Sequence, residues 1–175
     1  MRWLPYTILI VLVVALQTTV APRLAWMGAV PDWILVLVVF YAMNVPARHS
    51  LPCGWCAGAL ADLMSVERFG LLSLTYGCLA AGVCAIRGWV FVRHPLTQFG
   101  VTLAGVLAIR LSWGVYCAAV GQPGEPVGTL IWTCIYTACW APLLHGALLR
   151  ASPLLGLGRP GAVDRDGPRL GGHRV

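Results

Sequence analysis

Apolar residues fall in six long runs, which are separated by short segments that carry proline, glycine or charge. The runs cover residues 4–20, 31–45, 51–64, 71–86, 96–120 and 127–149. An α-helix rises about 1.5 Å per residue and the bilayer hydrocarbon is about 30 Å thick, so roughly 20 apolar residues cross it. The pattern therefore predicts an all-α membrane bundle of about six transmembrane helices, of which the second, third and fourth are short for independent spans.

Proline marks most of the expected helix ends, where its missing N–H does least damage. The prolines that fit this pattern are residues 22, 31, 46, 52, 95, 123 and 126. Pro142 is different because it lies inside the last apolar run. We expect it to kink the sixth helix.

Composition supports a membrane protein over a soluble one. The chain of 175 residues is 59% hydrophobic and 10% charged, and its mean hydropathy is +0.80, whereas a soluble domain is about one-quarter charged. The net charge of +6 comes from arginines scattered singly between apolar runs, which argues against nucleic-acid binding. The first apolar run is as long as a membrane span, so we expect it to remain as an uncleaved first helix.

The distribution of arginines predicts the orientation of the chain. Cytoplasmic loops are enriched in basic residues. With six helices and both termini in the cytoplasm, nine arginines lie inside and two, Arg23 and Arg68, lie outside. The inside set is Arg2, Arg48, Arg87, Arg93, Arg150, Arg159, Arg165, Arg169 and Arg174. Residues 1–150 are expected to form the transmembrane domain, and residues 151–175, rich in glycine, proline and arginine, a disordered basic cytoplasmic tail.

Two charged residues fall well inside apolar runs, Asp62 in the third and Arg110 in the fifth. Ionised groups are costly at membrane depth and are usually paired there. In the expected topology the two depths differ by about one helical turn, so we predict that Asp62 and Arg110 pair. The pair could be structural, part of a proton or substrate relay, or a polar contact to a partner helix.

Gly54, Gly58 and Asp62 are spaced four residues apart, which places them on one face of the third helix. Small residues on such a face let another helix backbone come close. That helix belongs either to the same bundle or to a partner protein, and the sequence leaves both open.

The remaining candidates for chemistry are weak. Cys53 and Cys56 have the spacing of a redox dithiol, but no second cysteine pair completes a metal site. The histidines at 49, 94 and 145 are expected at the inner membrane interface. No catalytic motif, paired carboxylates or phosphate-binding loop is present, so we expect no enzyme activity, no metal and no cofactor.

Three stretches give the chain a family resemblance. The first is Pro31-Asp32-Trp33, which opens a strongly apolar helix, and the second runs from Gly54 through Gly58 and Asp62 to Gly70-Leu71. The third is Trp140-Ala-Pro142, in a last helix that ends in a basic residue. With these features the sequence resembles the rod shape-determining protein MreD family over residues 4–150.

The resemblance implies a six-helix fold similar to the substrate-binding subunits of energy-coupling-factor transporters. It also implies a non-enzymatic scaffold of the bacterial cell-elongation and peptidoglycan-synthesis machinery in the cytoplasmic (inner) membrane. The implied partners are a single-span MreC-like protein and, with it, MreB filaments, RodA and its transpeptidase. The Pro31-Asp32 motif is expected to form a first helical turn, with proline preset for the helix and the acid favoured by its dipole.

Two other functions stay open at this point. One is a small-molecule-binding subunit of a membrane transporter, although the spans offer few polar groups to line a cavity, so no small-molecule substrate is expected. The other is a membrane thiol oxidoreductase, which depends on Cys53 and Cys56 alone.

Overall fold

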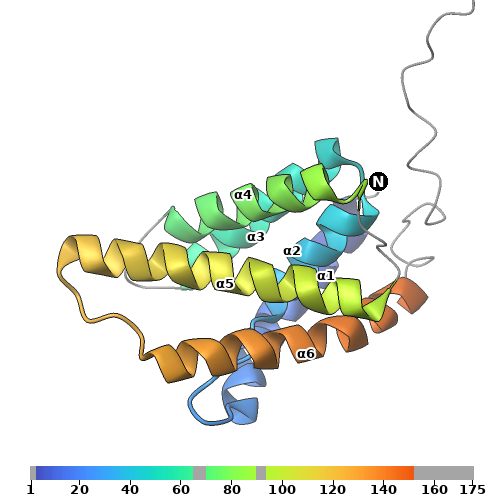
Figure 1. Ribbon diagram of the computed structural model, residues 1–175. Coiled ribbons are helices and arrows are strands. Elements are labelled where there is room, and N and C mark those ends of the chain that lie inside the picture. Colours follow the sequence, from blue (N-terminus) through green and yellow to red (C-terminus); the bar gives the residue numbers. More distant parts are fainter. Residues whose placement is uncertain (1–2, 65–69, 90–93, 152–175) are drawn as a thin grey trace, which may run out of the picture.

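A computed structural model describes residues 3–64, 70–89 and 94–151, which form six α-helices and one short 3-10 helix (Figure 1). The helices are α1 (Trp3–Thr19), η1 (Ala21–Leu24), α2 (Trp33–Asn44), α3 (Ala47–Met64), α4 (Leu71–Ile86), α5 (Pro95–Val120) and α6 (Val127–Ala151). This part of the chain contains no strand, only one isolated bridge between Trp26 and Ala29. The all-α prediction is confirmed for these residues. Of the predicted tail at 151–175, Ala151 is the last residue of α6, and the rest lies outside the described residues.

The predicted helix boundaries agree closely with the structure, with one exception. The fourth apolar run and α4 share the same limits, and most other limits differ by one or two residues. The prediction that Pro52 marks the start of the third helix is wrong, because α3 begins earlier, at Ala47, and contains Pro52. Pro52 is the sixth residue of α3, past the first turn, so it removes the helical hydrogen bond to the carbonyl of Arg48.

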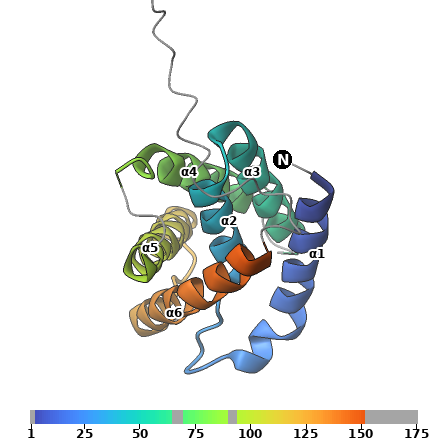
Figure 2. The same ribbon diagram turned by 90° about the vertical axis from the view of Figure 1, so that its right-hand side faces the viewer.

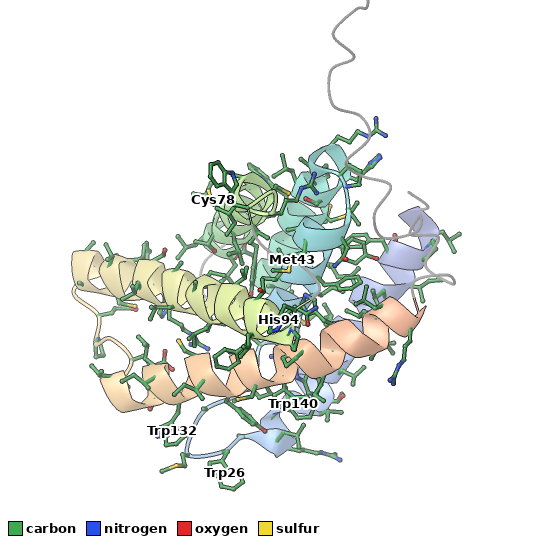
Figure 3. The ribbon with its side chains drawn as sticks, turned by 45° about the vertical axis from the view of Figure 1, so that its right-hand side comes forward. Trp26, Met43, Cys78, His94, Trp132 and Trp140 are labelled. Carbon is green, nitrogen blue, oxygen red and sulfur yellow. The ribbon has the colours of Figure 1, made fainter. Side chains whose placement is uncertain are left out.

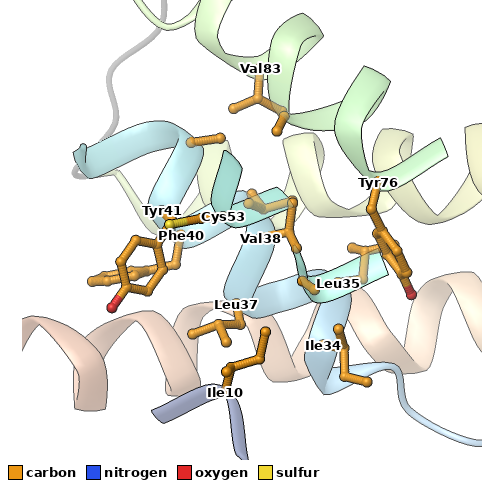
Figure 4. Packing of buried hydrophobic residues seen from close by; sticks show 14 of the residues in the cluster. Ile10, Ile34, Leu35, Leu37, Val38, Phe40, Tyr41, Cys53, Tyr76 and Val83 are labelled. Carbon is orange, nitrogen blue, oxygen red and sulfur yellow. The ribbon is translucent and has the colours of Figure 1, made fainter. Parts of the chain in front are cut away.

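Helix α2 forms the centre of the bundle, and Figure 2 shows it surrounded by the other five. Eleven of its twelve residues are buried. Leu35, Val39 and Phe40 are completely covered, and Figure 4 shows Leu35 and Phe40 among their neighbours from other helices. Because α2 is apolar on every side, the other helices bury it from all directions. The centre of the molecule is therefore filled with side chains.

The sixth helix places a histidine in this apolar centre. His145 is fully buried, its ring lies 5.3 Å from that of Phe40, and its Nδ1 is 3.0 Å from the Ala141 carbonyl oxygen. The ring is thus covered by α2 and not exposed on the outside of the bundle, and the predicted position near the inner membrane interface stays a prediction. The place of His145 near the last turns of α6 suggested the membrane surface, but the ring points inward toward α2.

Helices α3 and α4 pack with their backbones almost touching. A Cβ atom added to Gly54 would lie 2.8 Å from the Ala80 Cβ, and one added to Gly58 would lie 2.6 Å from the Leu72 carbonyl oxygen. The close spacing therefore requires glycine at both positions, as in the small-residue interfaces of membrane helices.

Two of the described helices, α5 and α6, are long and apolar enough to span a membrane. Helices α1, α2 and α4 are apolar but shorter, with 17, 12 and 16 residues. Aromatic residues near the surface include Trp26 and Trp132, whose exposed rings are labelled in Figure 3. In the same region Trp140 packs edge-on against Trp33, with ring centroids 5.8 Å apart.

The contact between α3 and α4 can be tested by a matched pair of glycine substitutions. Gly58→Ala forces a methyl group into the α4 backbone and should lower the free energy of unfolding by about 1–3 kcal/mol. Gly82→Ala meets no atom within 4 Å and should raise helix stability by up to about 1 kcal/mol. Thermal unfolding of the full chain in mild detergent measures both. An unchanged or raised melting temperature for Gly58→Ala would contradict the packing described here.

Candidate functional site

Polar side chains gather at the end of the bundle where α2 and α4 begin, which we call the capped end. Asp32, Asp62, Tyr76 and Arg110 all lie there, although they come from four different helices or helix starts. They surround the first turns of two helices, whose free N–H groups carry a partial positive charge.

Asp62 caps α4 from the neighbouring helix. It is 1% exposed, and its carboxylate accepts hydrogen bonds from the backbone N–H groups of Gly70 at 3.0 Å, Leu72 at 3.0 Å and Ser73 at 2.9 Å. The residue at the usual cap position is Gly70, with φ of 104°, which has no side chain to supply the cap. Asp62 thus neutralises the start of α4 and ties α3 to it.

Asp32 does the same for α2 and also links it to two other helices. One carboxylate oxygen accepts from the Leu35 N–H at 3.0 Å, and the other accepts from the Tyr76 hydroxyl at 2.7 Å. The backbone N–H of Asp32 donates to the Thr137 hydroxyl at 3.1 Å. Asp32 is the N-cap of α2, which begins at Trp33. The prediction that Pro31 and Asp32 form the first turn of this helix is therefore wrong by two residues. The expected preference of this position for an acid still holds, because a cap also faces the helix dipole.

The prediction that Asp62 and Arg110 pair is wrong. Arg110 forms its ion pair with Glu125, at 3.0 Å between Nη1 and Oε2, with side chains 30% and 24% exposed. Asp62 instead lies two residues before the end of α3 and faces the start of α4. A count of residues along each run placed the two charges within about one helical turn of each other, whereas each has other partners at the capped end.

The position of Arg110 at the capped end follows from the unequal lengths of α4 and α5. Helix α5 has 26 residues and α4 has 16, so α5 extends beyond its neighbour. Arg110, although central in α5, lines a cavity together with Leu71 and Leu72 from the first turn of α4. Glu125 was missed by the sequence analysis because it lies between α5 and α6. Its position shortly before the start of α6 was the available signal.

The cavity at the capped end has a volume of about 290 Å³. Its wall combines Asp32, Thr75, Tyr76 and Arg110 with apolar residues and Trp113. It therefore offers a cation, a carboxylate and hydroxyl groups within one small space. Such a set can hold a polar group that carries both charges. Among the described residues, no three His, Cys, Asp or Glu side chains are grouped in a way that could hold a metal ion.

The remaining residues proposed from sequence have structural positions. The face of Gly54, Gly58 and Asp62 packs against α4 of the same chain, so the interpretation of this face as a partner interface is wrong. Cys53 is buried and Cys56 is exposed, and both are free thiols. Pro142 lies inside the continuous helix α6, where the predicted kink stays a prediction.

Asp62 and Arg110, the two residues of the predicted pair, should differ in their importance for stability. Asp62→Asn removes the charge that three N–H groups share, and should lower the free energy of unfolding by about 2–4 kcal/mol. Arg110→Gln breaks a part-exposed ion pair and should cost at most about 1 kcal/mol. Thermal unfolding in detergent compares them, and equal losses for the two variants would contradict the roles assigned here.

Comparison with known proteins agrees with the resemblance seen in the sequence. The family model described as rod shape-determining protein MreD matches residues 1–145. No curated protein and no solved structure matches the chain. Since the match covers most of the chain and includes all of the capped end, the chain belongs to the MreD family of rod shape-determining proteins.

Proposed function

We propose that this chain is a non-enzymatic, multi-pass scaffold of the bacterial cell-elongation machinery, which binds a single-span MreC-like partner in the cytoplasmic membrane. Membership of the MreD family supports a role in rod shape. Through the partner, the scaffold links MreB filaments to RodA and its transpeptidase, as the family resemblance implies. All six helices lie in the membrane in an arrangement similar to the energy-coupling-factor subunits.

The observation that carries the proposal is the filled centre of the bundle. Helix α2 is covered along its whole length by side chains of the other helices. A protein with this interior acts mainly through its outer surface. That surface is strongly apolar: on α1, for example, Leu4, Ile8 and Val11 are 71%, 61% and 58% exposed, which suits contact with lipid or with another membrane helix.

The two ends of the bundle support an orientation with both termini in the cytoplasm. At the end opposite the capped end, Arg87 donates to the Val45 carbonyl oxygen at 2.5 Å, so a cation meets the C-terminus of α2. Arg48 follows Val45 by three residues. This basic end faces the cytoplasm, in agreement with the positive-inside rule, and the acidic caps face outward.

A second function is favoured by one observation, the cavity with Asp32, Tyr76 and Arg110. In this alternative the chain is a small-molecule-binding subunit of a transporter. The volume of about 290 Å³ is at the lower limit of ligand sites, which are typically about 300–1,000 Å³. A melting temperature raised by a small polar ligand would favour this alternative.

Crosslinking in native membranes tests the scaffold. The full chain, tagged at one terminus, is crosslinked, purified in mild detergent and analysed by mass spectrometry. We expect a single-span MreC-like protein to be recovered, and cell-wall polymerases with it. A tagged multi-pass protein of unrelated function, expressed at the same level, is the control. Recovery of ATPase subunits, or no partner above the control, would contradict the scaffold and favour the transporter subunit.

A further inference from the structure

A long apolar groove runs between α4 and α5 on the outside of the bundle. Its volume is about 750 Å³. Its wall includes Leu74, Cys78 and Leu79 from α4, and Ala104 and Ala108 from α5. Figure 3 labels Cys78, which α4 presents on the exterior. The wall is thus almost entirely hydrocarbon.

Two of the glycines that line the groove face open space. A Cβ added to Gly82 of α4 or Gly100 of α5 would meet no atom within 4 Å. Helix α4 is held against α3 by the glycine contacts, and α5 runs beside α6 (Figure 1). Each helix is therefore fixed by a different neighbour, and the space between α4 and α5 stays open.

The apolar groove and the polar cavity at the capped end share part of their walls. Leu71, Thr75 and Ile109 line both. One surface therefore has a polar part, at the level where α2 and α4 begin, and an apolar part that runs along the helices from there. In a membrane the starts of the short helices α2 and α4 lie near the headgroups, whereas α5 continues for ten residues beyond Arg110. The surface thus changes from polar to apolar at the level where a lipid changes from headgroup to acyl chain.

The charges at the polar part select among lipids. Among the described residues at this site, Arg110 supplies one positive charge, whereas Asp32 and Glu125 supply two negative charges beside it. This surplus of acid disfavours a headgroup that is only anionic. A headgroup with a phosphate and a primary ammonium complements both signs, because the phosphate is placed at Arg110 and the ammonium donates to a carboxylate.

We propose that the cavity and groove together bind one phosphatidylethanolamine molecule, with its headgroup at Arg110 and Asp32 and an acyl chain along the groove between α4 and α5. This site goes beyond the scaffold function, which needs no specific lipid. A helix of a partner protein is the main competing occupant. The lipid accounts for the polar and the apolar parts of the surface together, and for the opposite charges at one end.

Native mass spectrometry of the purified full chain tests the proposal. The protein in mild detergent is titrated with phosphatidylethanolamine, phosphatidylglycerol or phosphatidylcholine of identical acyl chains. We expect phosphatidylethanolamine to bind about tenfold more tightly than either of the others, since only it combines the phosphate with N–H donors. Equal or tighter binding of phosphatidylglycerol would overturn the charge selection, and with it the proposal.

Variants locate the site. Gly82→Leu places a side chain in open space within the groove, and Arg110→Gln removes the cation without disturbing the core; each should weaken phosphatidylethanolamine binding about tenfold. Gly146→Leu is the matched control, because Gly146 is an exposed glycine of α6 with no atom near its Cβ. Gly146→Leu should bind phosphatidylethanolamine with the same affinity as the unchanged protein.

Two results would reject the lipid site even if lipid selectivity were found. The first is unchanged binding by Gly82→Leu, which would place the lipid elsewhere. The second is photocrosslinking from position 78 in native membranes that captures a protein helix in place of lipid, which would identify the groove as a protein interface. Because the titration uses the purified chain alone, its failure leaves the MreC-like partner to be judged by its own crosslinking experiment.

Discussion

The close contact between α3 and α4 is the constraint on which the rest of the bundle depends. Glycine at 54 and 58 lets the two backbones meet, and the Asp62 carboxylate then reaches three N–H groups at the start of α4. The cap depends on the glycine contact, because the Asp62 carboxylate reaches those N–H groups only when α3 and α4 are close. A buried, unpaired carboxylate would be costly. The connection also sets the position of Tyr76, which fixes Asp32 and the start of α2.

The bundle has a chemical polarity that matches its helix dipoles. Acids meet the helix N-termini at the capped end, and Arg87 meets the C-terminus of α2 at the other. These interactions satisfy backbone groups that have no partner within their own helix, which is essential where water is scarce. Asp32, which caps α2, also lines the polar cavity at the capped end. One residue at this end therefore both stabilises a helix start and contributes to a cavity that could bind a ligand.

Much of the fold could be predicted from the sequence, but less of the site. Apolar runs and prolines gave five of the six helices to within about two residues, because helix length and helix breaking are local properties. The glycine face was correctly placed on one side of α3, and its contact was within the bundle. The pairing of Asp62 with Arg110 failed because it assumed that helices begin at equal depths. Depth depends on how helices of different length are packed, and Glu125, in a loop, has no periodic signal.

The unequal lengths of the helices have a consequence for the surrounding bilayer. Helix α4, with 16 residues, rises about 24 Å, and α5, with 26 residues, rises about 39 Å. The protein therefore presents a thin hydrophobic edge on one side and a thick one beside it. In the proposed multi-pass arrangement, lipids next to α4 compress or tilt to match that edge, at a cost of fractions of a kcal/mol per Å of mismatch. Any molecule that covers the thin edge relieves this strain, so the membrane itself favours assembly on that side.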